Sequence, residues 1–362
     1  MPFTPLDKDA ASKRPMLPNR LVSTLQQTCV EQGFVTGFKE IIGQDSAISF
    51  LRSAYSARRL AHAYVFVGPD GVGKRTTALK FAQLLVCEDS KKSEEPCEKC
   101  PACIKARGLA HPDIVWVNPE GQFVKIDSIR QACRRLSLKG FESSYKVLIV
   151  PQAQYLNDES SNALLKTLEE PSADTVIILI APSLRDILPT IASRCQRVVF
   201  SSLDRESLAK LLQEKFGVAK HESSYLAAMA DGSLGRALRY FKGQLFARKN
   251  SFIKEVFDQR LRLDDFIDVS KQERAQRDEN IEEVLGVISS WFRDLLVAKA
   301  CAGAGVFINI DREADIMRAC RDLSFGEIEL KLGAIADTLN EISRNVNARI
   351  SLTKMRVELW KQ

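Results

Sequence analysis

The 362-residue sequence contains no apolar run long enough to span a bilayer, because charged residues interrupt every hydrophobic stretch before about 18 positions. Its first residues, MPFTPLDKDAASKRP, lack the apolar core of a secretion signal. We therefore expect a soluble, cytoplasmic protein without a membrane partner. Internal repeats and low-complexity linkers are also missing, and the net charge of +6 is far below that of a dedicated DNA-binding protein.

The cysteines do not suggest disulfides, because a framework of such bonds is typical of small secreted chains and this chain is large. Four of the nine cysteines follow the spacing C-x9-C-x2-C-x2-C, at Cys87, Cys97, Cys100 and Cys103. Two successive Cys-x-x-Cys steps bring three thiolates to one ion, and a fourth completes a tetrahedron. The spacing predicts a structural zinc site with no open position. An iron–sulfur cluster and unliganded reduced thiols are the alternatives.

Five short apolar runs alternate with helix-length segments in the first half of the chain, at 63–67, 113–117, 146–150, 175–181 and 197–200. Their apolar residues occupy consecutive positions, which is typical of strands covered on both faces. The pattern predicts an α/β domain with a parallel sheet flanked by helices.

Beyond residue 203 the strand signals give way to helical spacing. One candidate helix carries apolar residues at steps of four and three, namely Ile328, Leu332, Ile335, Leu339 and Ile342. Such a seam packs either into the core of its own domain or against another subunit, and the spacing alone leaves both open.

The first strand leads directly into GPDGVGKRTTALKFAQLL, the order of strand, glycine-rich loop and helix that forms a phosphate-binding loop. The loop's backbone N–H groups and the N-terminus of the following helix would face phosphate oxygens, and the lysine would add a positive charge. A glycine turn that binds no nucleotide is the alternative. The candidate contacts in this segment are Gly68, Gly71, Gly73, Lys74 and Thr76.

Two departures from a hydrolytic site are visible. Arg75 stands where a Ser or Thr would hold Mg²⁺, and Thr76 follows one residue late, turned by about 100° on a helix. Pro151 and Gln152 end the third strand, where a nucleotide hydrolase would carry Asp-Glu. Neither can act as a base, and the nearby 158–159 acidic pair opens the next helix, where it complements the helix dipole.

These motifs together resemble the bacterial DNA polymerase III clamp-loader subunits, a family of AAA+ ATPases. The resemblance covers 37 to about 240 and rests on IIGQ (41–44), RLAHAYVFVGPDGVGK (59–74), the four cysteines, NDESSNALLKTLEEP (157–171) and LPTIASRCQRVVF (188–200). The family contains ATP-hydrolysing gamma and tau subunits and a delta-prime kind whose own site usually does not hydrolyse ATP. Arg75 and Pro151-Gln152 make this sequence similar to the delta-prime kind.

The resemblance implies roles for two arginines. Arg194, within Ser193-Arg194-Cys195, would supply an arginine finger to ATP bound on a neighbouring subunit. Arg236 matches a second arginine that touches bound nucleotide in active members. The alternatives are a surface arginine paired with local carboxylates and an ordinary exposed helix residue.

Residues 1–36 contain four prolines and little apolar periodicity, so we expect an extension there, for which the family has no counterpart. For the rest of the chain the resemblance implies an AAA+ domain over 37–202 with a zinc insert at 87–103, a helical lid over 203–245 and an all-α collar over 246–362. The expected function is that of a non-hydrolysing clamp-loader subunit within the DNA polymerase III holoenzyme, with a degenerate ATP/Mg²⁺ site and structural zinc. Its expected partners are the gamma/tau and delta subunits and, through the assembly, the sliding clamp and primer-template DNA. A gamma/tau-type ATPase and a stand-alone zinc-containing nucleic-acid-binding module are the competing hypotheses.

Overall fold

The computed structural model describes residues 37–89, 94–120, 123–257, 274–300, 307–344 and 346–360, with the side chains of 255–257 and 274–279 left out. The predicted extension over 1–36 lies outside these residues. The chain divides into two compact units, with the boundary between Ser201 and Ser202. The further division of the second unit into lid and collar remains a prediction.

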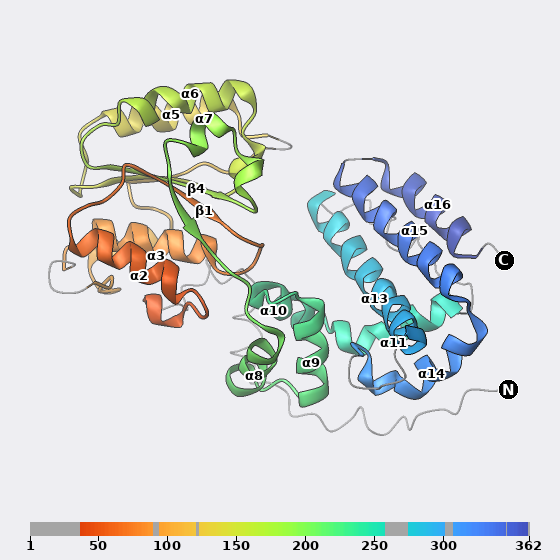
Figure 1. Cartoon of the computed structure of the whole chain (residues 1–362). Coiled ribbons are helices and arrows are strands. Elements are labelled where there is room, and N and C mark those ends of the chain that lie inside the picture. Colours follow the sequence, from red (N-terminus) through yellow and green to blue (C-terminus); the bar gives the residue numbers. More distant parts are fainter. Residues whose placement is uncertain are drawn as a thin grey trace. The chain divides into compact units, whose positions relative to one another are not determined.

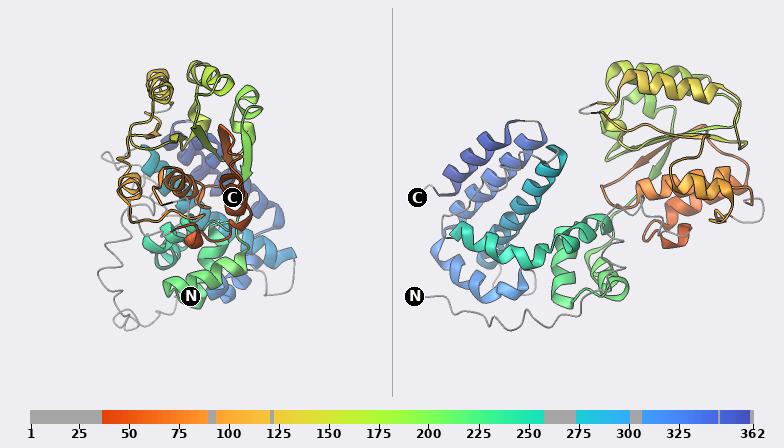
Figure 2. Two further views of the ribbon diagram at one scale, coloured as in Figure 1. Left: turned by 90° about the vertical axis from the view of Figure 1, so that its left-hand side faces the viewer. Right: turned by 180° about the vertical axis from the view of Figure 1, so that it is seen from behind.

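The first unit is built on a parallel sheet with the strand order β2-β3-β4-β1-β5. Helices cover both of its faces, with α2 and α3 on one side and α5, α6 and α7 on the other (Figures 1 and 2). The predicted fold class is confirmed. The strands are β1 (Ala63–Val67), β2 (Ile114–Trp116), β3 (Lys146–Val150), β4 (Thr175–Ala181) and β5 (Gln196–Val199), and the helices are α2 (Asp45–Ser56), α3 (Lys74–Val86), α4 (Pro101–Arg107), α5 (Ile126–Ser137), α6 (Asp158–Glu169) and α7 (Pro189–Ala192).

Burial along the strands follows their place in the sheet. Every residue of β1, β3 and β4 is buried, which agrees with their unbroken apolar runs. The expectation that all five runs are covered on both faces is wrong for β5, where Val198 is buried but Arg197 and Val199 are exposed. β5 lies at the edge of the sheet, where the helical cover leaves three of its four side chains exposed.

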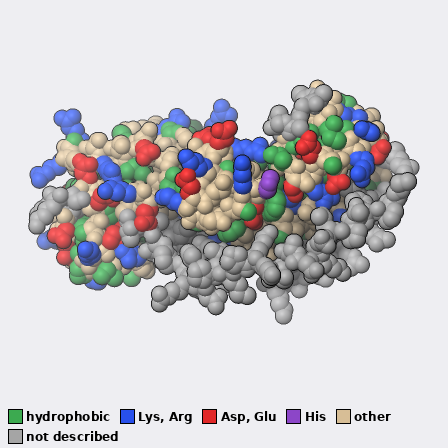
Figure 3. Space-filling model, turned by 90° about the horizontal axis from the view of Figure 1, so that it is seen from below, with side chains coloured by type: hydrophobic (Ala, Val, Ile, Leu, Met, Phe, Trp, Pro, Cys, Tyr) green, Lys and Arg blue, Asp and Glu red, His purple; other side chains and the backbone are tan. Residues whose placement is uncertain are grey.

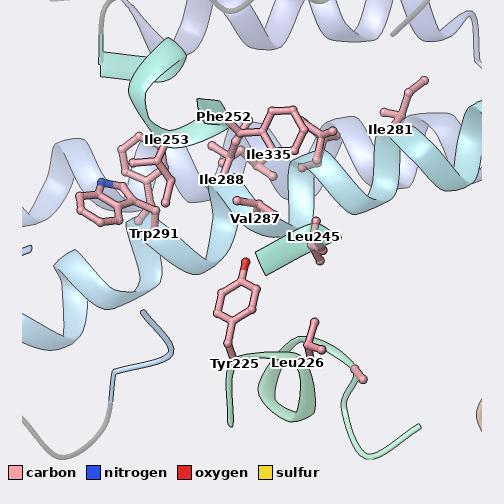
Figure 4. Close-up of a cluster of buried hydrophobic side chains, with 14 of the residues drawn as sticks. Tyr225, Leu226, Leu245, Phe252, Ile253, Ile281, Val287, Ile288, Trp291 and Ile335 are labelled. Atoms are coloured by element: carbon pink, nitrogen blue, oxygen red, sulfur yellow. The ribbon is translucent and has the colours of Figure 1, made fainter. Parts of the chain in front are cut away.

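The second unit is helical throughout its described residues, and its helices share one apolar core. Figure 4 shows Tyr225 and Leu226 of α9 directed toward Leu245, Val287 and Ile288 of α11 and α13. The helices are α8 (Arg205–Phe216), α9 (Lys220–Met229), α10 (Leu234–Lys242), α11 (Leu245–Phe257), α13 (Arg274–Ala300), α14 (Glu313–Asp322), α15 (Phe325–Ser343) and α16 (Ala348–Leu359).

The predicted seam lies on α15 and faces this core. Ile328, Ile335 and Ile342 are buried in it, while Leu332 and Leu339 pack against its edge. Of the two interpretations left open by the spacing, internal packing is therefore the one observed. None of the described helices is both long and apolar enough to cross a membrane.

A buried ionic network reinforces the second unit. The Lys249 ammonium is fully buried, pairs with Asp311 and lies 4.4 Å from the centre of the Tyr225 ring. Burial lowers the pKa of Lys249, whereas the Asp311 carboxylate acts in the opposite direction. The buried Asp294 carboxylate accepts hydrogen bonds from the backbone N–H groups of Ile308 (3.0 Å) and Asn309 (2.7 Å). Charged groups inside an apolar core are tolerated because each has a partner.

In the first unit, the Asp113 carboxylate holds the loop that precedes β3. It is buried and accepts hydrogen bonds from the backbone N–H groups of Phe141 (2.7 Å), Glu142 (2.8 Å) and Ser143 (2.9 Å). Burial by itself would raise the pKa of Asp113, but these donors outweigh it and the pKa is lowered. The ionised carboxylate therefore stabilises the fold.

We predict that Asp113→Ala destabilises this loop by about 2 kcal/mol, because three backbone N–H groups lose the charged carboxylate that accepts from them. Hydrogen exchange measured by mass spectrometry should become faster over residues 138–145. Since the folded pKa lies below the ordinary value, the stabilisation is complete above pH of about 4 and is lost as the pH falls through the lowered pKa. Unchanged protection in the variant would contradict this role.

Candidate functional site: loop, cysteine cluster and arginine

The glycine-rich loop joins β1 to α3, as the sequence predicts. The Gly68 N–H donates to the carbonyl oxygen of Pro182 at the end of β4, over 3.1 Å. A Cβ atom at Gly68 would lie 2.2 Å from the carbonyl oxygen of Phe200, just beyond β5, so no larger residue fits there. Gly73 caps the N-terminus of α3 at φ 106°, a conformation that favours glycine, and Gly71 also has a positive φ.

The Lys74 side chain is buried inside this loop. Its ammonium donates to the carbonyl oxygens of Gly68 and Pro69, the latter over 2.7 Å, and lies 3.4 Å from the Asp70 carboxylate. Burial lowers the pKa of Lys74, and Asp70 opposes that effect. To contact a phosphate, the ammonium would exchange backbone carbonyls for phosphate oxygens.

The position expected to bind Mg²⁺ carries a cation instead. The Arg75 guanidinium lies 5.4 Å from the centre of the Trp116 ring, at the end of β2. Thr76 follows in the first turn of α3 and is half-buried, and the hydroxyl of Thr77 donates to the Gly73 carbonyl oxygen over 2.9 Å. Arg75 thus supplies positive charge where a hydroxyl ligand would be needed.

The edge of the sheet next to the loop lacks the paired carboxylates of a hydrolase. Pro151 is buried and Gln152 is exposed where β3 ends. The side chain of Asn157 caps α6 by accepting from the Ser160 N–H over 2.9 Å, which confirms that the acidic residues 158–159 belong to a helix N-terminus. β4 ends at Ala181, which Pro182 follows, and neither residue has a polar side chain.

The IIGQ segment makes a polar contact beside the loop that the sequence pattern does not predict. The side-chain amide of Gln44, in the IIGQ segment, donates to the Ser201 carbonyl oxygen (2.8 Å) and accepts from the Ser201 N–H (3.1 Å). Gln44 is buried, so this double hydrogen bond fixes the chain leaving β5. In the sequence Gln44 stands directly before a helix, and that pattern does not identify Ser201 as its partner.

The four predicted cysteines converge. Their sulfur atoms all lie within 4.8 Å of one another, and the Sγ atoms of Cys97 and Cys103 are 3.9 Å apart. A tetrahedral Zn²⁺ with Zn–S bonds of about 2.3 Å requires sulfur atoms about 3.8 Å apart, so the residues fit this ion. The cluster is a candidate metal site, and bound zinc would be a structural cross-link.

Backbone donors around the cluster favour thiolates. The N–H groups of Cys97, Cys100 and Cys103 point at the sulfur atoms of Cys87, Cys97 and Cys100, over 3.3–3.4 Å. Burial opposes ionisation, but these and neighbouring donors lower the pKa of Cys97 to about 7. Burial raises the pKa of Cys87 and Cys103, so a cation beside these two thiols would be needed to hold them as thiolates.

The cysteine insert is fastened to α3 by contacts that the sequence pattern did not indicate. The Glu98 carboxylate pairs with the buried Lys80 ammonium over 2.5 Å and with the Arg107 guanidinium. The side chain of Gln83, also on α3, donates to the Cys103 carbonyl oxygen over 3.0 Å. Residues 97–107 are therefore held against the same helix that begins at the glycine-rich loop.

Arg194 lies at the surface, just beyond α7. Its side chain is 37% exposed, and its guanidinium donates to the Thr190 carbonyl oxygen (2.9 Å) and to the Glu169 carboxylate (2.8 Å). Glu169 ends α6 and belongs to the LEEP part of the quoted motif. The ion pair between Arg194 and Glu169 agrees with the alternative of a surface arginine that pairs with a nearby carboxylate. The Arg194 side chain nevertheless remains accessible to a neighbouring subunit.

Cys195 and Arg236 have contacts of their own. Burial raises the pKa of Cys195 to about 12, so its thiol stays protonated and packs as a small apolar group, as predicted. Arg236 lies on α10 in the second unit, where its guanidinium is 3.4 Å from the Asp231 carboxylate. A contact between Arg236 and nucleotide remains a prediction.

Residues 43–204 match the family model described as DNA polymerase III, delta subunit. The DNA polymerase III subunit delta' of Bacillus subtilis is 32% identical over 215 residues, which are 59% of this chain and 64% of the relative. The subunit delta' of Pseudomonas aeruginosa is 34% identical over 179 residues, covering 48% of this chain and 53% of the relative.

The DNA polymerase III subunit tau of Bacillus subtilis is 26% identical over 297 residues, covering 74% of this chain and 51% of the relative. The chain thus spans between about half and two-thirds of the length of these curated relatives. The region matched by the family model contains the glycine-rich loop, the four cysteines and Arg194. Over the matched residues this chain is therefore similar to DNA polymerase III subunits of the delta, delta' and tau kinds.

Proposed function

We propose that this chain is a delta-prime-type subunit of a bacterial replicative clamp loader, which does not hydrolyse ATP itself and assists hydrolysis on a neighbouring subunit. The proposal rests on the glycine-rich loop, which keeps Lys74 but is combined with Arg75 at the position of a Mg²⁺ ligand and with Pro151-Gln152 in place of two carboxylates. A phosphate-binding backbone is kept, whereas the groups that would order Mg²⁺ and activate water are replaced.

The chemistry of hydrolysis explains why these replacements matter. Phosphoryl transfer from ATP needs Mg²⁺ to bridge the phosphates and a polar group to orient the attacking water. Arg75 repels a cation, Pro151 has no side-chain donor or acceptor, and the neutral Gln152 amide cannot accept a proton near pH 7. Nucleotide contacts from Gly68, Gly71, Gly73, Lys74, Thr76 and Arg236 therefore serve binding at most.

Arg194 is the residue proposed to act on the neighbour. A guanidinium placed on the γ-phosphate of ATP bound to another subunit would neutralise the charge that develops as the phosphoryl group leaves. The side chain is accessible, and two of its donors are held by Glu169 and the Thr190 carbonyl, which limits its conformations. The remaining donors are available to a phosphate.

The proposed cofactor of the cysteine cluster is structural Zn²⁺, bound by Cys87, Cys97, Cys100 and Cys103. With four sulfur ligands the ion has no position for water, so its contribution is stability of the insert rather than catalysis.

The proposed partners are gamma/tau and delta subunits, with the sliding clamp and primer-template DNA reached through the assembly in the cytoplasm. The delta-prime and tau relatives support this proposal. On the face shown in Figure 3, basic and acidic side chains intermingle, which does not favour an autonomous nucleic-acid-binding module.

A gamma/tau-type ATPase is the second candidate, because the tau relative aligns over more of this chain than the delta-prime relatives do. Steady ATP hydrolysis by the purified chain that is abolished by Lys74→Ala would favour it over our proposal.

The central prediction concerns Arg194→Ala in the assembly reconstituted with gamma/tau and delta subunits. Hydrolysis at the affected site should slow by about 10³-fold, because the γ-phosphate loses a compensating charge. Single-turnover ATP hydrolysis measures this site, and size-exclusion chromatography shows whether the assembly still forms. Normal hydrolysis by an intact variant assembly would remove Arg194 from the mechanism.

A smaller effect is predicted for Glu169→Ala, which releases the guanidinium of Arg194 from its carboxylate. Hydrolysis should slow by no more than about fivefold, since an exposed ion pair contributes about 0.2–1 kcal/mol. Glu170→Ala is the matched control. The loss should vanish when Arg194 is already alanine, and an equal loss in that background would mean that Glu169 acts by another route.

For the cysteine cluster, Cys100→Ser should lower the zinc content well below about one ion per chain, because a hydroxyl is a poorer ligand than a thiolate. Inductively coupled plasma mass spectrometry measures the metal, and faster hydrogen exchange over 97–107 reports the loosened insert. Cys133→Ser, outside the cluster, should retain full zinc. Equal zinc in both variants would refute the site.

A further inference from the structure

The Arg75 side chain extends from the first turn of α3 to the end of β2. Its guanidinium lies 5.4 Å from the centre of the Trp116 ring, and this ring packs on the face of the sheet that α3 covers. Trp116 is paired with Ile149, the last but one residue of β3. The guanidinium is therefore close to the end of β3, where a nucleotide hydrolase carries the carboxylate that orders Mg²⁺.

Two donors at this contact have no acceptor. The Nε atom of Arg75 and the Nε1 atom of Trp116 are buried and make no hydrogen bond. The Asp70 carboxylate of the loop lies beside Lys74 instead. Because a buried donor without an acceptor is costly, an anion that offers several oxygen atoms is favoured here.

The residues around the loop do not fit Mg²⁺. This ion requires an octahedron of oxygen ligands at about 2.1 Å, usually one or two carboxylates together with phosphate oxygens and water. The end of β3 offers only Pro151 and the neutral amide of Gln152, and the Thr77 hydroxyl donates to the Gly73 carbonyl oxygen. Among the described residues, the only group of three or more side chains that could hold a metal ion is the cysteine cluster.

We propose that the glycine-rich loop binds the polyphosphate of a nucleotide without Mg²⁺, and that the Arg75 guanidinium takes the place of the metal. The inference rests on the proposed function in one respect, the binding of nucleotide at this loop. A guanidinium neutralises phosphate charge, as Mg²⁺ does, and donates two parallel hydrogen bonds to phosphate oxygens. It requires no carboxylate ligands, which agrees with Pro151-Gln152 at the end of β3.

Binding of this kind requires the guanidinium to turn from the Trp116 ring toward the loop. The Arg75 Nε atom makes no hydrogen bond that would oppose the movement, and the cation–π contact is the interaction that is given up. The Trp116 indole therefore reports the movement, because its fluorescence depends on the charge beside the ring.

The first test is isothermal titration of the full-length chain with ADP, in EDTA and in excess Mg²⁺. The wild-type chain should bind about tenfold or more tightly in EDTA, because Mg²⁺ competes with Arg75 for the same phosphate oxygens. Arg75→Thr restores a hydroxyl ligand, so this variant should lose about tenfold in affinity in EDTA and should no longer be inhibited by Mg²⁺. Arg130→Thr, an exposed arginine of α5, is the matched control and should behave as wild type.

Two further titrations locate the ligand. Lys74→Ala, checked for folding by far-UV circular dichroism, should abolish binding, and binding that survives in the folded variant would place the nucleotide elsewhere and overturn the inference. Pyrophosphate should show the same dependence on Mg²⁺ as ADP, since phosphate oxygens carry the interaction. Tighter binding of ADP in Mg²⁺ by the wild-type chain, or an equal response to Mg²⁺ in Arg75→Thr, would also overturn it.

Tryptophan fluorescence tests the movement of Arg75. ADP in EDTA should change the emission of the wild-type chain but not that of Arg75→Thr, and Trp116→Phe should remove the change. A wild-type chain that binds ADP with unchanged emission would show that Arg75 stays on the ring, which contradicts its role as a substitute for the metal.

The inference and the proposed function fail separately. A folded wild-type chain that binds no ADP in either condition would overturn the inference, whereas the role of Arg194 in the assembly would still be decided by Arg194→Ala. Steady ATP hydrolysis by the chain alone would instead contradict the proposed function.

Discussion

The close approach of the Gly68 backbone to the ends of β4 and β5 is the contact on which the candidate site depends. In a parallel sheet the carboxyl ends of all strands lie at one edge, and here β1 ends where Pro182 and Phe200 leave their strands. The absence of a side chain at Gly68 allows this approach, and the double hydrogen bond between Gln44 and Ser201 fixes the chain beyond β5. The direction in which α3 begins follows from this contact.

Electrostatics then separates phosphate binding from phosphate cleavage. The loop concentrates positive charge through Lys74, Arg75 and the N-terminus of α3, and the adjacent strand end at Pro151-Gln152 offers no carboxylate to balance it. Apart from the Asp70 carboxylate beside Lys74, these charges are of the sign that attracts an anion, which is the basis of the proposed function. Arg194 follows α7, which covers the face of the sheet opposite to α3 (Figure 1). Its side chain reaches solvent. The proposed function assigns different roles to these two places, nucleotide binding to the loop and contact with another subunit to Arg194.

Several local ion pairs and hydrogen bonds stabilise the fold, in addition to the apolar cores. The cysteine insert is tied to α3 by Glu98 and Gln83, and Asp113 orders the loop before β3. In the second unit, helices from the predicted lid and the predicted collar contribute to a common apolar cluster. Lys249 and Asp294 are buried there with partners, which fixes how α9, α11 and α13 pack, because an unpaired charge in that environment would be costly.

The sequence alone determined what depends on local pattern. Unbroken apolar runs identified the strands, because a buried strand needs no polar face. The spacing of Cys97, Cys100 and Cys103 identified the cysteine cluster, because thiolates separated by two intervening residues reach one ion. Only the tertiary structure decided that β5 is an edge strand, that Glu98 meets Lys80, that Glu169 holds Arg194 and that Arg75 meets Trp116. These features either join residues that are distant in sequence or depend on what covers a surface. The periodicity of a single segment contains no information on either.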